Sequence, residues 1–215
     1  QKKPPAGVAT LDNNGCRFEP HVFFAQVGQT VEILNSDQTG HNANFGFLNN
    51  PGLNVLIPIG GKKEVTLVAD EPTLIPVDCN IHPWMKAHII VQEHPFVGIS
   101  NEQGEIEIIN LPVGEVTFLI RHESADGSID EGTVDGKAQK WSRGRMEIEL
   151  KPGVNDLGTI KLSPDKFKKS SKPPEPAGET PSVGSVTRTT RLHVRRVFSC
   201  AAANAREAFA AAFAI

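Results

Sequence analysis

The loop Asp78-Cys79-Asn80-Ile81-His82-Pro83-Trp84-Met85 lies directly after a predicted strand, and it decides how the first half of the chain is interpreted. The run that follows it, Ala87-His88-Ile89-Ile90-Val91, is rich in β-branched residues. Short apolar runs bounded by turn residues are typical of buried strands. The loop therefore connects strands and belongs to a β-structure.

The strand pattern recurs throughout the segment from Phe18 to Val91, which contains this loop. Short apolar runs with β-formers occur in Val31-Glu32-Ile33-Leu34 and in Glu64-Val65-Thr66-Leu67-Val68, and turn-rich pieces such as Asn49-Asn50-Pro51-Gly52 separate such runs. Repeated strands without a convincing helix pattern predict an antiparallel sandwich or barrel. We therefore expect an all-β domain over residues 1–95.

The strand pattern restarts after His94-Pro95. In Glu105-Ile106-Glu107-Ile108 the isoleucines share one face and the glutamates face water. A turn at Leu111-Pro112-Val113-Gly114 is followed by another apolar run, Val116-Thr117-Phe118-Leu119-Ile120. These features predict a second, smaller β-sandwich over residues 96–162.

Residues 163–215 differ in composition from both predicted sandwiches. The part from 163 to 185 is rich in Lys, Pro, Gly and Ser and cannot bury enough apolar surface to offset chain entropy, so we expect a disordered linker. The tail from Arg188 to Ile215 is Arg-rich and then Ala-rich, and Ala202 to Phe213 has the composition of a weak helix. The composition of this tail indicates no function.

The charge distribution argues against nucleic acid as a partner. Residues 1–95 carry a net charge of −3 and residues 96–162 of −5, whereas residues 163–215 carry +5. A nucleic-acid-binding protein is expected to carry basic surface on its folded modules. We therefore expect no nucleic-acid binding. No apolar run approaches the roughly 20 residues of a spanning helix, so we expect no membrane span either.

The loop after residue 78 offers three metal donors within seven residues: the Cys79 thiolate, the His82 imidazole and the Met85 thioether. Zinc rarely uses a thioether, whereas trigonal ligation by two His and one Cys with a weak axial Met selects copper for electron transfer. A second His has to come from elsewhere in the chain. His41, at the end of the strand that contains Val31-Glu32-Ile33-Leu34, is the natural candidate.

The order of these residues resembles the cupredoxins, or blue copper proteins. The resemblance covers about residues 8–92 and rests on Phe18-x-Pro20, Val27-Gly28-x-Thr30-Val31, the stretch from Asn35 to His41-Asn42, and an amicyanin-like C-x-x-H-P-x-M loop. It implies a Greek-key β-sandwich that binds one type 1 copper ion. The implied copper ligands are His41, Cys79, His82 and Met85. Asn35 or Asn42 is implied to support them through hydrogen bonds.

The resemblance also implies a function, which is to carry single electrons between redox partner proteins. His82 would be the partly exposed edge for electron passage, and Pro83 and Trp84 would form an apolar docking patch beside it. Four protein ligands leave no open position for a substrate, so we do not expect an enzyme. The chain starts at Gln1 without Met, which fits a cleaved export signal, and we expect a periplasmic or secreted protein.

Cys16 leaves other interpretations open. A Cys16–Cys79 disulfide would leave a copper-free structural or adhesive binding module, and oxidising compartments favour such bonds. A binuclear copper site that uses both sulfurs is a thinner alternative, and copper storage or delivery would use the same ligands. Few residues precede Leu11, so the opening strand of a cupredoxin is missing or contracted in this interpretation. The remaining histidines, which we interpret as structural, are His21, His88, His94 and His122.

The second predicted sandwich resembles carboxypeptidase regulatory-like, or transthyretin-like, domains. The resemblance rests on Asn101-Glu102-x-Gly104-x-Ile106, Ile109-x-Leu111-Pro112-x-Gly114-x-Val116 and Gly158-x-Ile160. It implies a spacer or docking module. Its acidic loop, with His122, Glu123, Asp126 and Asp130, could be drawn as a metal site, but such loops are usually solvated.

Overall fold

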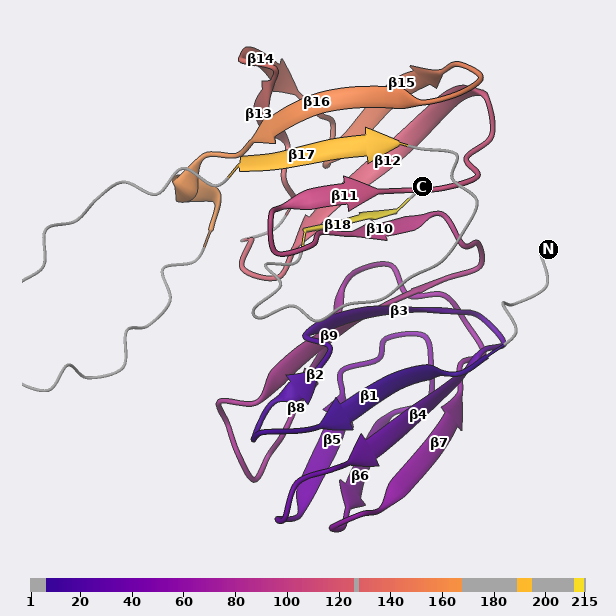
Figure 1. The fold of residues 1–215 in the computed structure, drawn as a ribbon, viewed down its shortest axis with the longest axis vertical. Helices are drawn as coiled ribbons and strands as arrows, with labels where there is room; N and C mark the ends of the chain where they lie inside the picture. The colour runs from indigo at the N-terminus through magenta and orange to yellow at the C-terminus, as the bar shows by residue number, and fades with distance from the viewer. Residues whose placement is uncertain (1–6, 126–127, 168–188, 195–210, 215) are drawn as a thin grey trace, which may run out of the picture.

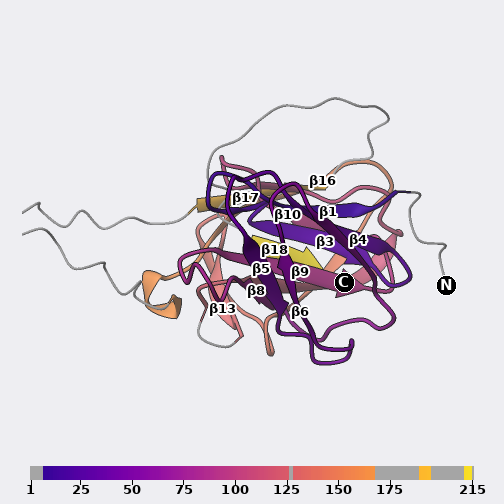
Figure 2. The ribbon, with the colours of Figure 1, turned by 90° about the horizontal axis from the view of Figure 1, so that it is seen from below.

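The computed structural model describes residues 7–125, 128–167, 189–194 and 211–214. Two β-domains lie end to end along the longest axis of the molecule (Figures 1 and 2). Helical structure in the described ranges is limited to the short 3-10 turn η1 (Pro164–Lys166). The predicted all-β class, a β-sandwich followed by a second β-domain, is confirmed.

The first domain is a sandwich of two sheets with a continuous apolar core between them. One sheet has the order β2-β1-β4-β7 and the other the order β3-β9-β8-β5-β6. Inward residues of both sheets, such as Leu11 and Ile33 from one and Val77 and Ile89 from the other, are buried in one cluster. The strands are β1 (Ala9–Asn13), β2 (Phe18–Glu19), β3 (Val22–Gln26), β4 (Thr30–Asn35), β5 (His41–Phe45), β6 (Leu53–Ile57), β7 (Lys62–Thr66), β8 (Ile75–Asp78) and β9 (Lys86–Gln92).

Two features of this sandwich differ from the sequence-based expectation. The pairs β1–β4 and β3–β9 are parallel, so the sandwich is mixed rather than purely antiparallel. The opening strand is present, because the five residues of β1 pair along their whole length with β4, from Ala9 opposite Val31 to Asn13 opposite Asn35. The few residues before Leu11 are sufficient for this strand, since pairing in register needs only one short extended segment.

The second domain also packs two sheets around an apolar core, which contains Phe118, Trp141 and Ile160. The sheets have the orders β10-β18-β12-β15 and β11-β17-β16-β13-β14. Their strands are β10 (Val97–Ile99), β11 (Glu105–Glu107), β12 (Gly114–His122), β13 (Glu131–Val134), β14 (Lys137–Lys140), β15 (Arg145–Leu150), β16 (Asn155–Lys161), β17 (Thr189–Val194) and β18 (Ala211–Ala214).

The last two strands bear on the expectations for the tail. The prediction of a weak helix over Ala202–Phe213 is wrong for its last residues, because residues 211–214 form β18, which pairs with β10 and β12. The free backbone groups at those strand edges are satisfied by an added strand, which outweighs the weak helix propensity of alanine. The rest of that stretch, and most of the predicted linker 163–185, lies outside the described residues.

The two domains meet at the outer face of β3 and β9. Val22 and Ile90, which point away from the first core, pack with Val97 and Ile99 of the second domain. The Arg121 guanidinium donates a hydrogen bond to the carbonyl of Pro72 across the same junction, at 3.2 Å.

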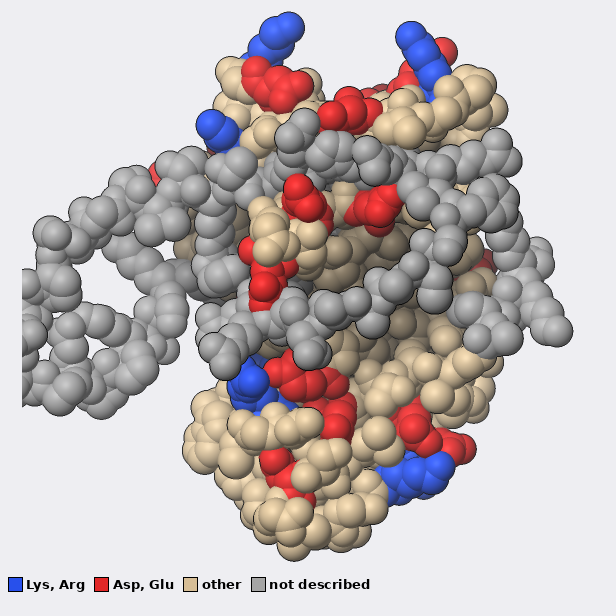
Figure 3. Space-filling view, viewed as in Figure 1, with Lys and Arg blue, Asp and Glu red and all other residues tan. Residues whose placement is uncertain are grey.

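On the face drawn in Figure 3 the Lys and Arg side chains lie at separate places among acidic ones. Among the described residues, no helix is both long and apolar enough to cross a bilayer.

Candidate metal centre

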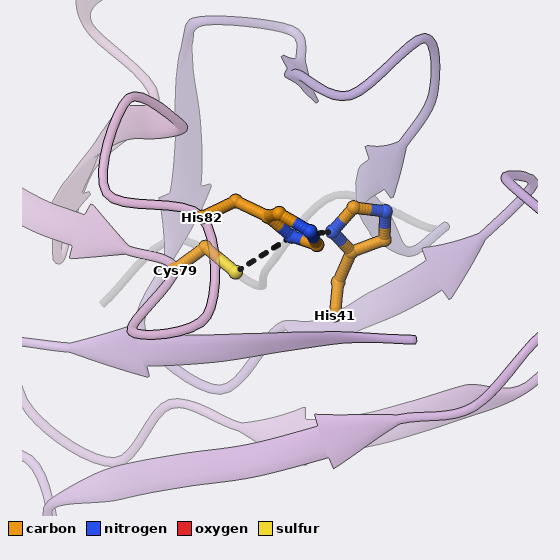
Figure 4. A group of neighbouring side chains, drawn as sticks. All are labelled: His41, Cys79 and His82. Atoms are coloured by element: carbon orange, nitrogen blue, oxygen red, sulfur yellow. Dashed lines mark hydrogen bonds between the residues drawn. The ribbon is translucent and has the colours of Figure 1, made fainter. Parts of the chain in front are cut away.

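Three side chains from different segments of the first domain converge on one point (Figure 4). His41 begins β5, Cys79 directly follows β8, and His82 lies in the loop between β8 and β9. The Nδ1 atoms of His41 and His82 are 2.9 Å apart, and the Cys79 Sγ lies 3.7 Å from the His82 Nδ1. One donor atom from each residue lies within 4.8 Å of the others. The structure thus brings together three of the four predicted ligands.

The backbone of the loop explains how Cys79 and His82 come to face each other. The Met85 N–H donates to the His82 carbonyl at 2.9 Å, and the Cys79 N–H donates to the Met85 carbonyl at 3.2 Å. These bonds fold the loop back on itself between the two strands. The Met85 side chain is only 1% exposed and packs in the core cluster that also contains Cys79. Its role as an axial ligand stays a prediction.

Asn42 ties the loop to the neighbouring strand. Its Oδ1 accepts hydrogen bonds from the backbone N–H groups of Asn80, at 2.7 Å, and Ile81, at 3.3 Å, and lies 3.4 Å from the Cys79 Sγ. Its Nδ2 donates to the Asn54 Oδ1 at 2.8 Å. Asn42 directly follows His41 in β5. Its hydrogen bonds to the loop therefore fix the position of the Cys79 thiol relative to the His41 ring.

Asn35 supports the other side of the site. Its Nδ2 donates to the carbonyls of Thr39, at 2.8 Å, and Ile57, at 2.9 Å, and its Oδ1 accepts from the Asp37 N–H at 3.0 Å. An Asn that bonds to the backbone two residues later closes an Asx turn. Asn35 therefore sets the course of the loop that leads into His41.

Asp37 is a residue of the site that sequence reasoning missed. Its Oδ2 accepts a hydrogen bond from the Nε2 of His41 at 2.9 Å. Burial acts to raise the pKa of Asp37, but the backbone N–H groups of Cys16 and Gly15 and the His41 ring outweigh it and hold the pKa below its usual value. An ionised carboxylate only accepts, so the His41 Nε2 carries the hydrogen and a neutral ring leaves its Nδ1 lone pair free.

The arrangement fits a transition-metal ion. Ring nitrogens bind such ions at about 2.0 Å and thiolate sulfur at about 2.3 Å. The 2.9 Å between the two Nδ1 atoms and the 3.7 Å between the Cys79 Sγ and the His82 Nδ1 are each less than the sum of two such bonds. A carboxylate that holds the far nitrogen of a ligating His is the usual outer support of a metal site. His41, Cys79 and His82 would hold the ion.

The Cys16–Cys79 disulfide considered above is not formed in the structure. Cys79 is a buried free thiol and Cys16 is an exposed free thiol. Cys16 lies in a turn with a positive φ of 54°, and its backbone N–H donates to the Asp37 carboxylate at 2.9 Å. The turn therefore places the backbone of Cys16 near the site, while its thiol is left to solvent.

The outer edge of the site is apolar. His82 is half-buried, whereas His41 is fully buried. The Trp84 side chain is 66% exposed, with its ring centroid 5.1 Å from that of His82. Pro83 and Ile81 in the same loop are also exposed. The surface beside the His82 ring therefore carries the predicted Pro83 and Trp84.

Sequence reasoning also missed a second group of potential ligands. His21, His88 and Glu123 bring one donor atom each within 4.8 Å of the others, although Glu123 belongs to the second domain. Of the other acidic residues in the loop after His122, Asp130 pairs with Lys166, and Asp126 lies outside the described residues. No local sequence signal could have paired Glu123 with histidines of the first domain.

Comparisons with known proteins give limited likenesses. No protein family and no curated protein matches the chain. Among solved structures, the chain is similar to the Cu(I) form of a point mutant of amicyanin, with 20% identity over 42% of this chain and 93% of that chain at a TM-score of 0.36. It is also similar to the copper-containing nitrite reductase from Thermus scotoductus, with 25% identity over 41% of this chain and 25% of that chain, again at 0.36. Scores this low carry no argument about function, which depends on the site itself.

Proposed function

We propose that the first domain is a mononuclear type 1 copper protein that carries single electrons between redox partners. The observation that carries this proposal is the convergence of one buried thiol and two imidazole Nδ1 atoms, one of whose rings is held by a carboxylate. A thiolate with two imidazoles is the donor set of blue copper sites. Met85 is the proposed weak axial ligand, because it ends the same short loop and is buried in the same core cluster as Cys79.

The chain's own residues supply rigidity and burial. When bound, copper supplies one-electron chemistry by alternating between Cu(I) and Cu(II). Asn42 fixes the Cys79 loop, and Asp37 fixes the His41 ring. The strands β5 and β8, which position His41 and Cys79, contribute to one packed core. A ligand set that moves little between the two oxidation states favours rapid transfer in both directions. The network therefore supports an electron carrier better than it supports copper storage or delivery, which needs easy metal release.

Electrons would pass through the half-buried edge of His82. The exposed Ile81, Pro83 and Trp84 around it form an apolar surface on which a redox partner protein could dock. Apolar and aromatic surfaces of this kind are common at interfaces between proteins. A periplasmic or secreted location, and the relation of the second domain to carboxypeptidase regulatory-like domains, stay predictions from the sequence.

Protein-film voltammetry of the full chain after copper loading tests the carrier function. We expect one reversible one-electron wave whose midpoint potential rises in Met85→Leu, because loss of the thioether donor destabilises Cu(II) more than Cu(I). A chain that binds copper but gives only a slow, irreversible wave and loses the metal to a mild chelator would favour storage or delivery instead. Met146→Leu, at a buried methionine in the core of the second domain, is a matched control and should leave the wave unchanged.

A further inference from the structure

A second cluster of potential ligands lies at the junction of the two domains. His21 immediately precedes β3, His88 lies in the neighbouring strand β9, and Glu123 immediately follows β12 of the second domain. The His21 Nε2 contacts the Glu123 Oε2, and the His88 Nδ1 lies 3.5 Å from the same oxygen. The pairing of β3 with β9 sets the two rings side by side, with centroids 5.8 Å apart. All three side chains are half-buried or more.

The His21 ring has the orientation of a metal ligand. Its Nδ1 lies 3.0 Å from the backbone carbonyl of Lys86, which can only accept, so this nitrogen carries a hydrogen. The Nε2 is then the atom that contacts the Glu123 Oε2, and a metal ion bound between them would take the place of the hydrogen that this nitrogen shares with the carboxylate. Metal-bound histidines almost always donate their other N–H to a carbonyl or carboxylate in this way. Lys86 itself pairs with Asp78 through its ammonium group, at 2.7 Å, and does not fill the cluster.

The His88 ring provides the observation that an ion pair alone does not explain. Its Nδ1 is buried and has no hydrogen-bond partner. A buried polar atom without a hydrogen-bond partner is destabilising, and such atoms are rare in folded proteins. The contact between His21 and Glu123 satisfies those two residues and leaves the His88 Nδ1, 3.5 Å from the Glu123 Oε2, without a hydrogen bond.

We propose that His21, His88 and Glu123 form a binding site for a divalent transition-metal ion of the Zn²⁺ class, shared between the two domains. Two imidazoles and one carboxylate are a common ligand set for Zn²⁺, with a fourth position left for water. The ion would give the His88 Nδ1 its missing partner. Because His21 adjoins Val22 and His88 lies two residues before Ile90, the ion would sit beside the apolar contact between the domains and stabilise it.

Zinc titration of the full chain, followed by calorimetry, tests the proposal. The comparison uses four proteins: the parent, Glu123→Gln, Cys79→Ser and the combination of both. Since Zn²⁺ could also enter the Cys79 site, we expect the Cys79→Ser protein to retain one zinc ion per chain. Adding Glu123→Gln to it should weaken that binding about tenfold or more. Glu115→Gln, at an exposed residue of β12, the strand that Glu123 follows, is the matched control and should bind zinc as the parent does.

The ligand atoms and the folding of the variants are checked by separate measurements. X-ray absorption at the zinc edge of the loaded Cys79→Ser protein should show nitrogen and oxygen ligands with imidazole scattering. Zinc should raise the thermal midpoint of this protein, but not that of its Glu123→Gln or His88→Ala derivatives. The proposal is overturned if the Cys79→Ser protein binds no zinc, or if the protein that combines Cys79→Ser with Glu123→Gln, shown to be folded by an unchanged circular dichroism spectrum, binds zinc as tightly as the Cys79→Ser protein.

Discussion

The two histidine clusters of this protein differ in where their parts come from. His41, Cys79 and His82 belong to one sandwich, and two of them lie three residues apart in one loop. His21 and Glu123 are separated by 102 residues and meet only because two domains pack together. The first cluster has a hydrogen-bonded frame of its own, whereas the second leaves the His88 Nδ1 without a hydrogen bond. A site built within one domain can be ready for an ion before it binds; one built across a junction gains order when it binds.

A third polar cluster, around Glu71, is one in which the chain itself supplies all the hydrogen-bond partners. The buried Glu71 carboxylate accepts hydrogen bonds from the backbone N–H groups of Leu48, Asn49 and Asn50 and from the Asn50 side chain, all between 2.8 and 3.2 Å. Each oxygen has partners from the chain itself. Glu71 thus serves as the structural reference against which the two histidine clusters can be compared.

The largest expected effect is at Cys79. Cys79→Ser removes the only thiolate of the first cluster, so the intense sulfur-to-copper absorption should vanish entirely, while Met85→Leu should keep it. Visible spectra of the copper-loaded proteins measure this. The Cys79→Ser protein should still bind zinc through His21, His88 and Glu123. If the Cys79→Ser protein absorbs like the parent, the ligand assignment is wrong.

The next effect is at Glu71. Glu71→Ala removes the acceptor of the backbone N–H groups of Leu48, Asn49 and the buried Asn50, and we expect a loss of about 3 kcal/mol in the free energy of unfolding at pH 7. Urea denaturation measures it, and addition of zinc or copper should not restore the loss. A change below about 0.5 kcal/mol would contradict the structural role of this cluster.

The same carboxylate predicts a pH dependence. Burial acts to raise the pKa of Glu71, but the hydrogen bonds from the Asn50 side chain and the three backbone N–H groups outweigh it and lower the pKa below its ordinary 4.5. Its contribution to stability is therefore complete above about pH 4.5 and is lost as the pH falls through the lower, folded value. The stability difference between the parent and Glu71→Gln should shrink over that interval; a difference that grows on acidification would reverse the sign.

A smaller effect is expected at Asn42. Asn42→Ala removes the acceptor of the Asn80 and Ile81 N–H groups, and we expect about 2 kcal/mol of destabilisation in the metal-free protein. The loop should then hold copper less tightly, seen as faster loss of the metal to a chelator. Asn44→Ala on the same strand is the control, because its contact with Asn80 is long, at 3.5 Å. Equal chelation rates in the two variants would mean that Asn42 does not preform the site.

The smallest effect on stability is expected at Trp84. Its exposed ring contributes little to the core, so Trp84→Ala should change the free energy of unfolding by about 0.5 kcal/mol or less. Electron exchange with a redox partner should nevertheless slow, because the apolar surface beside His82 is reduced. Leu48→Ala, at an equally exposed residue outside the loop, is the control. Similar exchange rates in both variants would place the docking surface elsewhere.

The sequence predicted what depends on local pattern. Alternating apolar residues located the strands, and the spacing of Cys79, His82 and Met85 in one loop indicated the metal donors. The parallel pairing of β3 with β9 and the contact of Glu123 with His21 depend on how distant segments pack, which no local pattern records. Asp37 was missed because one carboxylate in a polar turn has no distinctive signal until His41 is placed beside it.

The most direct test of the metal-site assignment is the combined visible and paramagnetic-resonance spectrum of the reduced, folded chain after addition of Cu(II). The structure predicts an intense charge-transfer band and the signal of a single copper ion with strong thiolate character, at one ion per chain. A colourless protein with an unmodified Cys79 thiol would contradict the account.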